Sequence, residues 1–80
     1  MVDEVTNKPL RVLSDSVAGP FLMLPLSQLA RVREALDQNG IYYWPDSTAI
    51  SLDNKPPRIV INFGRTGDAN RIQAVLDEAG

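Results

Sequence analysis

Residues 58–79 constrain the fold more than any other stretch, because a strand, a glycine-bounded turn and an amphipathic helix follow one another directly. Apolar side chains first alternate with other residues at the period of a strand that has one strongly apolar face: Ile59, Ile61 and Phe63. Asp68 is a favoured helix N-cap. The helix stripe then repeats at i, i+3, i+4 and i+7, through Ile72, Val75, Leu76 and Ala79. We expect this stripe to cover the strand.

Composition limits the chemistry that the chain can perform. The 80 residues predict one domain with a small core. Cysteine and histidine are both missing, which removes disulfides, thiolate metal sites, the commonest metal ligand and the commonest general base. We therefore predict no catalytic residues, no bound metal and no cofactor, and we expect the protein not to be an enzyme.

Charge and hydropathy limit the partners. The ten acidic and eight basic residues are interspersed, so no basic stripe is available and nucleic-acid binding is disfavoured. No apolar run approaches the roughly 20 residues that span a bilayer, and the first residues are acidic where a secretory signal would be basic. We expect a cytoplasmic protein that does not associate with membranes.

The first half of the chain predicts two strands and a helix. Residues 1–8 are polar and aperiodic, typical of a flexible N-terminal arm. Residues 10–12 suggest a short strand, and the continuous apolar run at 21–24 suits a central strand covered on both sides. Ser27 is the expected N-cap of a helix over residues 28–39. Gly40 should end that helix in a left-handed conformation, with Ile41 folding back in a Schellman motif.

The remaining segments complete the sheet. We expect strands at residues 41–44 and 49–52, and a turn at 53–57 that returns the chain into the strand at 58–63 as a hairpin. Together the elements predict a single α+β domain over residues 9–80. Its expected architecture is a ferredoxin-like two-layer sandwich, with a mainly antiparallel sheet and two helices on one face. The segment near Leu10 either fills the vacant sheet edge or leaves that edge open.

Four segments follow one another along the chain: ALDQNGIYYW, a hairpin, IVINF and DANRIQAVLDEAG. Together they resemble a family of short bacterial signal-transducing proteins whose fold is akin to that of the nitrogen-regulatory PII proteins. The resemblance covers roughly residues 19–79 in order of elements. It implies a ferredoxin-like fold and a role in signal transduction. The chain departs from this pattern, because the closing strand and the long target-binding loop of PII proteins are missing. We therefore do not transfer nucleotide or 2-oxoglutarate binding.

The turn at residues 64–68 is the first candidate site. A glycine-bounded turn at a helix N-terminus offers N–H groups and a favourable helix dipole to an anion, with Arg65, Thr66 and Gly67 as the ligand-binding residues. Asp68 would occupy those N–H groups and repel a phosphate, and the lysine of a Walker motif is missing. A plain strand-to-helix turn is therefore the favoured interpretation.

The aromatic run is the second candidate site. On a strand Tyr42 and Trp44 share one face, while Ile41 and Tyr43 share the other. Tyr42 and Trp44 are interface candidates if the second face of the sheet is uncovered, although core and rim positions explain them equally well.

Three carboxylates are the remaining candidates for chemistry, but Asp46 and Asp53 lie in predicted turns and Asp68 at a predicted cap. The leading functional hypothesis is thus a non-enzymatic interaction or regulatory module that associates through its sheet with a protein partner or as a homodimer. The alternative is a domain that binds a small anionic ligand at the 64–68 turn.

Overall fold

The strand and helix predicted at residues 58–79 are present in a computed structural model of the protein, which describes residues 1–51 and 53–79. The strand is β4 (Arg58–Asn62) and the helix is α2 (Ala69–Glu78). Asp68 is the N-cap, as predicted, and its carboxylate accepts a hydrogen bond of 3.1 Å from the Arg71 N–H. The other elements are β1 (Leu13–Asp15), β2 (Gly19–Pro25), the 3-10 helix η1 (Leu26–Gln28), α1 (Leu29–Gln38) and β3 (Trp44–Pro45).

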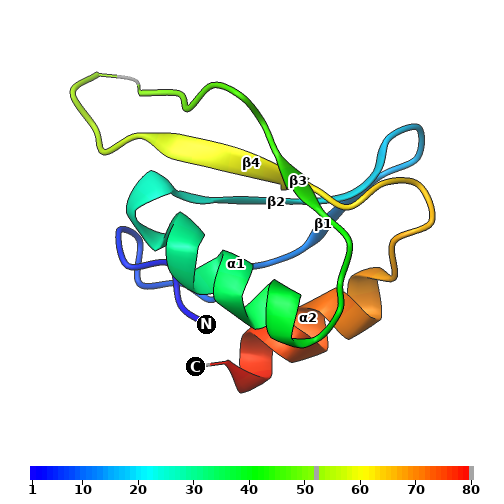
Figure 1. Ribbon diagram of the computed structural model, residues 1–80. Coiled ribbons are helices and arrows are strands. Elements are labelled where there is room, and N and C mark those ends of the chain that lie inside the picture. The colour runs from blue at the N-terminus through cyan, green and yellow to red at the C-terminus, as the bar shows by residue number, and fades with distance from the viewer. Residues whose placement is uncertain (52, 80) are drawn as a thin grey trace.

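The strands form a four-stranded antiparallel sheet in the order β1-β2-β4-β3. Because β2 and β3 both run antiparallel to β4, they are parallel to each other, and α1 joins them as a crossover with β4 inserted between them. Figure 1 shows both helices on one side of the sheet. The predicted fold class is confirmed, an α+β sandwich of ferredoxin-like arrangement.

The core fills the space between the sheet and the helices. The inward side chains of β2 and β4 meet the apolar stripes of both helices, and each is at most 7% exposed: Leu22, Leu24, Ile59, Ile61, Val32, Leu36, Ile72 and Leu76. Because side chains alternate along a strand, this inward set fixes which residues of β2 and β4 point to the opposite face.

The strand expected at residues 10–12 is wrong, because the edge strand β1 begins three residues later. Leu10 is in the core, 2% exposed. The side chain of Gln73 on α2 satisfies the backbone here: its Oε1 accepts from the Val12 N–H at 2.8 Å, and its Nε2 donates to the Leu10 carbonyl at 2.9 Å. With these groups occupied, pairing begins only at Leu13, which lies opposite Phe21 and fills the edge beside β2.

The first helix differs from the prediction at its N-terminus, whereas its C-terminus has the predicted conformation. Ser27 is not its cap: α1 begins after Gln28 with no side-chain cap, and the Ser27 hydroxyl bonds the Glu4 carboxylate instead. The C-terminal end is a Schellman motif, as predicted. Gly40 has φ of 64°, and the N–H of Ile41 donates to the Leu36 carbonyl at 3.0 Å.

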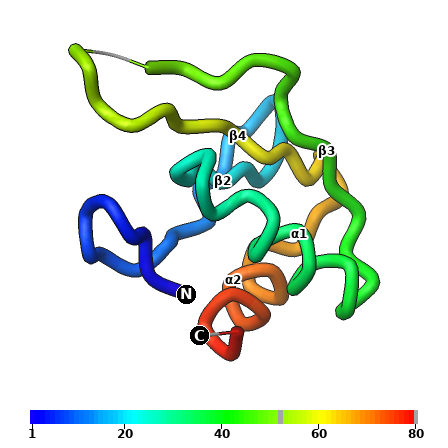
Figure 2. The backbone as a smooth tube through the Cα atoms, turned by 60° about the vertical axis from the view of Figure 1, so that its left-hand side comes forward, coloured from blue at the N-terminus to red at the C-terminus, as the bar shows by residue number. Residues whose placement is uncertain are grey.

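The segment predicted as a flexible arm, residues 1–8, contacts the rest of the chain at its beginning, where Met1 and Asp3 are buried, whereas residues 4–8 are exposed. Asp3 is 4% exposed and forms a 2.8 Å ion pair with Arg58 of β4. The Met1 ammonium donates to the Leu76 carbonyl, and Figure 2 shows this segment beside the end of α2. Gln28 adds two bonds of 2.8 Å, from the Glu4 N–H and to the Val2 carbonyl. The polar sequence of the segment is thus used for contacts within the fold.

The segment after β3 bulges away from β4. Pro45 lies opposite Ile61 and Ile50 lies opposite Arg58, so the chain advances five residues from Pro45 to Ile50 while β4 advances three. The strand predicted at 49–52 is consequently reduced to one bridge at Ile50, and the strand predicted at 41–44 is present only as the two residues of β3. Residue 52 of the second strand lies outside the described residues. Figures 1 and 2 show residues 46–51 and 53–57 projecting beyond the sheet.

Candidate functional site

The face of the sheet opposite the helices carries the candidate site, and we call it the outer face. It is formed by side chains from all four strands, in the opposed pairs Leu13–Phe21, Phe21–Asn62, Met23–Val60 and Trp44–Asn62. Three of them are substantially exposed, Leu13 at 50%, Met23 at 43% and Trp44 at 44%. Neither α1 nor α2 covers this face (Figure 1). The prediction that β2 is covered on both sides is therefore wrong for the single chain.

The two interface candidates project from one end of this face. Tyr42 and Trp44 are 76% and 44% exposed, and their ring centroids lie 5.6 Å apart at an interplanar angle of 54°. Their neighbours face the other way, as the alternation predicts, since Ile41 and Tyr43 pack against the core. The indole of Trp44 lies over the backbone of Gly64, 3.6 Å from where a Cβ would stand. We call Tyr42 and Trp44 the aromatic pair; their role in an interface stays a prediction.

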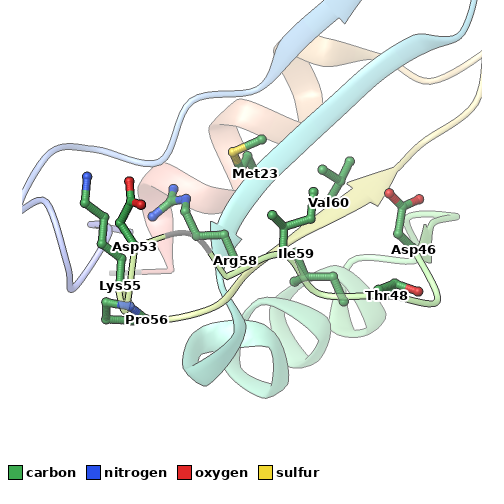
Figure 3. Close-up of a pocket in the computed structure, with 10 residues that line it drawn as sticks. Met23, Asp46, Thr48, Asp53, Lys55, Pro56, Arg58, Ile59 and Val60 are labelled. Atoms are coloured by element: carbon green, nitrogen blue, oxygen red, sulfur yellow. The ribbon is translucent and has the colours of Figure 1, made fainter.

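A hollow of about 370 Å³ lies on the outer face where the 46–50 segment bulges. Its apolar surface includes Met23, Ile50 and Val60. Figure 3 shows Met23 and Val60 in the middle, with Arg58 toward one end and Asp46 at the other. The sequence gives no local signal for this hollow, because it arises from a register difference between two strands. Its apolar lining residues Met23 and Ile50 are exposed, but neither indicates a hollow from the sequence alone.

Two of the charged groups beside the hollow, Arg58 and Asp46, have hydrogen-bond partners within the chain. Burial alone would raise the pKa of Asp3, but hydrogen bonds from the Arg58 guanidinium and from the N–H groups of Thr6 and Val5 outweigh it and hold that pKa below its ordinary value of 3.8. The Asp3 carboxylate is therefore ionised at neutral pH and neutralises Arg58. At the other end, the Asp46 carboxylate accepts a hydrogen bond of 2.7 Å from the side-chain amide of Asn62.

The 64–68 turn has the local structure of a capped turn. The Gly67 N–H donates to the Gly64 carbonyl at 3.0 Å. The Asp68 carboxylate is held at the start of α2, so it places a negative charge where an anion would bind. Of the predicted ligand residues, Thr66 and Gly67 line a second hollow of about 200 Å³, together with Tyr42, whereas Arg65 does not line it. These contacts favour the plain structural interpretation of the turn.

The three carboxylates are not brought together as a set. Asp46 and Asp53 both line the larger hollow, and Asp68 is at the helix cap. Asp53 has a turn conformation with φ of 52°, in line with the predicted turn. Within the described residues no group of three or more metal-ligating side chains of the His, Cys, Asp and Glu types occurs.

Comparison with protein-family models, curated proteins and solved structures finds no match. In residues 1–51 and 53–79, no helix has both the length and the apolar character needed to cross a membrane.

Proposed function

We propose that the protein is a non-enzymatic interaction or regulatory module of the cytoplasm, which associates with a protein partner through the outer face of its sheet. The observation that carries the proposal is the exposure of apolar side chains from three strands on that one face, Leu13, Met23 and Trp44. Monomeric proteins rarely expose a contiguous apolar patch larger than a few hundred Å². Tyrosine and tryptophan, which form the aromatic pair beside this patch, are enriched in protein interfaces.

The chemistry of the chain supports a binding role over a catalytic one. The sequence contains no histidine and no cysteine, so the usual general base and the usual thiol nucleophile are both missing. Asp46 and Asp68 have structural partners, an amide side chain and a helix N-terminus. An exposed apolar surface, beside which Arg58 is neutralised by Asp3, is suited to burying area against another protein.

Site-specific photo-crosslinking tests this proposal in the cells that make the protein. A photoreactive phenylalanine analogue replaces Met23 on the outer face. The matched control places it at Ala74, which is exposed on α2 in the helix layer. We expect illumination to give a covalent adduct from position 23 and none from position 74. Equal adducts from both positions, or none from position 23, would refute association through the outer face.

A further inference from the structure

The aromatic pair and the hollow occupy opposite ends of β4 on the same face. Trp44 lies opposite Asn62 and its ring extends over Gly64, whereas the hollow lies along Arg58 and Val60. At a rise of about 3.4 Å per residue, their centres are roughly 10 Å apart along the strand. The outer face therefore has a projection at one end and a recess at the other.

Building on the function proposed above, we infer that the partner is a second copy of this chain, and that the aromatic pair of each copy fills the hollow of the other. A two-fold axis between the sheets and perpendicular to β4 reverses the direction of that strand. It therefore brings the aromatic end of one copy over the hollow of the other, twice in each dimer. This is the aligned type of sheet packing, with sheets about 10 Å apart.

The sizes of the two surfaces agree with this arrangement. Pockets of about 300–1,000 Å³ hold drug-sized molecules, so a hollow of about 370 Å³ can take an indole ring. Five aliphatic or aromatic side chains of this surface are 43–76% exposed: Leu13, Met23, Tyr42, Trp44 and Ile50. Together with the half-buried side chains beside them, they leave on the order of 500 Å² of apolar area exposed. With a polar rim this approaches the roughly 800 Å² per partner that a stable interface buries.

The charges permit contact between identical faces. A face with a large net charge repels its own copy, but Arg58 is neutralised by Asp3, and Asp53 and Lys55 carry opposite charges. Among the charged residues that line the hollow this leaves one unbalanced charge, that of Asp46, whose carboxylate accepts a hydrogen bond from Asn62. The formal net charge of the whole chain is only −2. Apolar residues and paired charges are self-complementary, as a contact about a two-fold axis requires.

A mixing experiment tests the reciprocal contact directly. Trp44→Ala removes the larger ring of the projection and keeps the hollow, whereas Ile50→Glu places a charge in the hollow and keeps the whole projection. Ala74→Glu on α2 is the charge-matched control. By light scattering we expect wild type and Ala74→Glu to form dimers. Because each dimer contains the contact twice, each of the other two variants should weaken dimerisation on the order of a thousandfold.

Mixing the two impaired variants should restore a 1:1 dimer, since one complete pair of projection and hollow is regenerated. Trp44 is the only tryptophan, so its fluorescence should shift to the blue as the wild-type protein is concentrated. If circular dichroism shows that Trp44→Ala is unfolded, Tyr42→Ser replaces it, because Tyr42 is 76% exposed and is not part of the core.

A wild-type protein that stays monomeric at about millimolar concentration overturns the second copy as partner. Failure of the mixture to dimerise overturns the reciprocal contact. The photo-crosslinking experiment at position 23 distinguishes these two outcomes from a failure of the proposed function. An adduct with a different protein leaves association through the outer face intact and removes only the homodimer.

Discussion

Replacing Gly19 with alanine should destabilise the fold more than the same change at Gly40. Both glycines have positive φ, 89° and 64°. A Cβ on Gly19 would lie 2.3 Å from the Gly64 carbonyl oxygen and 2.8 Å from the Arg65 Cα, and these backbone atoms belong to the turn after β4. A Cβ on Gly40 would meet no atom within 4 Å. Gly40→Ala therefore isolates the conformational cost, and Gly19→Ala adds a steric one.

The conformational cost of a left-handed residue is about 1–2 kcal/mol, and overpacking against a fixed neighbour adds about 1–3 kcal/mol. We therefore expect a loss in unfolding free energy of about 1–2 kcal/mol for Gly40→Ala and about 2–5 kcal/mol for Gly19→Ala. At about 0.05–0.15 kcal/mol per residue, an 80-residue domain has roughly 4–12 kcal/mol in total. The loss for Gly19→Ala is thus a large fraction of the total stability and should lower the urea midpoint clearly more than Gly40→Ala does.

Urea unfolding followed by circular dichroism measures both losses, provided that the slopes of the transitions agree. Equal midpoints for the two variants would refute the close approach of the β1–β2 turn to the turn after β4. A Gly40→Ala midpoint equal to that of wild type would refute the left-handed end of α1.

Three further changes test other parts of the structure. The pKa of Asp3 is lower in the folded protein than in the unfolded chain, so the ionised carboxylate stabilises the fold fully above its unfolded-state pKa, and this stabilisation is lost as the pH falls through its folded-state pKa. When the pH is lowered beneath about 4, the urea midpoint of wild type should therefore decrease more steeply than that of Asp3→Asn. Asp68→Asn keeps a good cap and should change the unfolding free energy by only a few tenths of a kcal/mol, roughly. The chemical shifts of the backbone amides in the 64–68 turn should not change with millimolar phosphate in wild type or in Asp68→Asn. Chemical-shift changes that grow in Asp68→Asn and vanish in Arg65→Ala would support the anion site instead. Gln28→Ala should cost about 1–3 kcal/mol and speed hydrogen exchange at the Glu4 amide, because the buried Gln28 side chain makes part-buried hydrogen bonds to the Glu4 N–H and the Val2 carbonyl; unchanged exchange would contradict the contact with Glu4.

Local signals were sufficient for β4, α2 and the C-terminal end of α1, although not for the segment between α1 and β4. The alternation in β4, the Asp68 cap and the glycine at position 40 each depend on residues within one turn or strand, and each is present as predicted. Local rules succeed here because an N-cap and a Schellman motif satisfy backbone groups with neighbours in sequence.

Contacts between distant residues decided what the sequence did not predict. Gln73 on α2 bonds the backbone of Leu10 and Val12, more than 60 residues away, and thereby delays the edge strand. Arg58 binds Asp3 at a separation of 55 residues, so the start of the chain contacts β4. The hollow depends on how β3 is aligned with β4, which neither strand specifies alone. Polar residues in a supposed arm are thus weak evidence of disorder when their partners lie elsewhere in the chain.

The apolar residues on both faces of β2 bear on how the chain assembles. A sheet with one face in water usually alternates apolar and polar residues, whereas a strand covered on both faces is apolar throughout. β2 is apolar on both sides: Leu22 and Leu24 are fully buried beneath the helices, and Phe21 and Met23 point outward. The helices supply one cover only. In the proposed dimer the sheet of the second copy supplies the other, so the pattern of β2 and the exposure of Met23 have the same physical explanation.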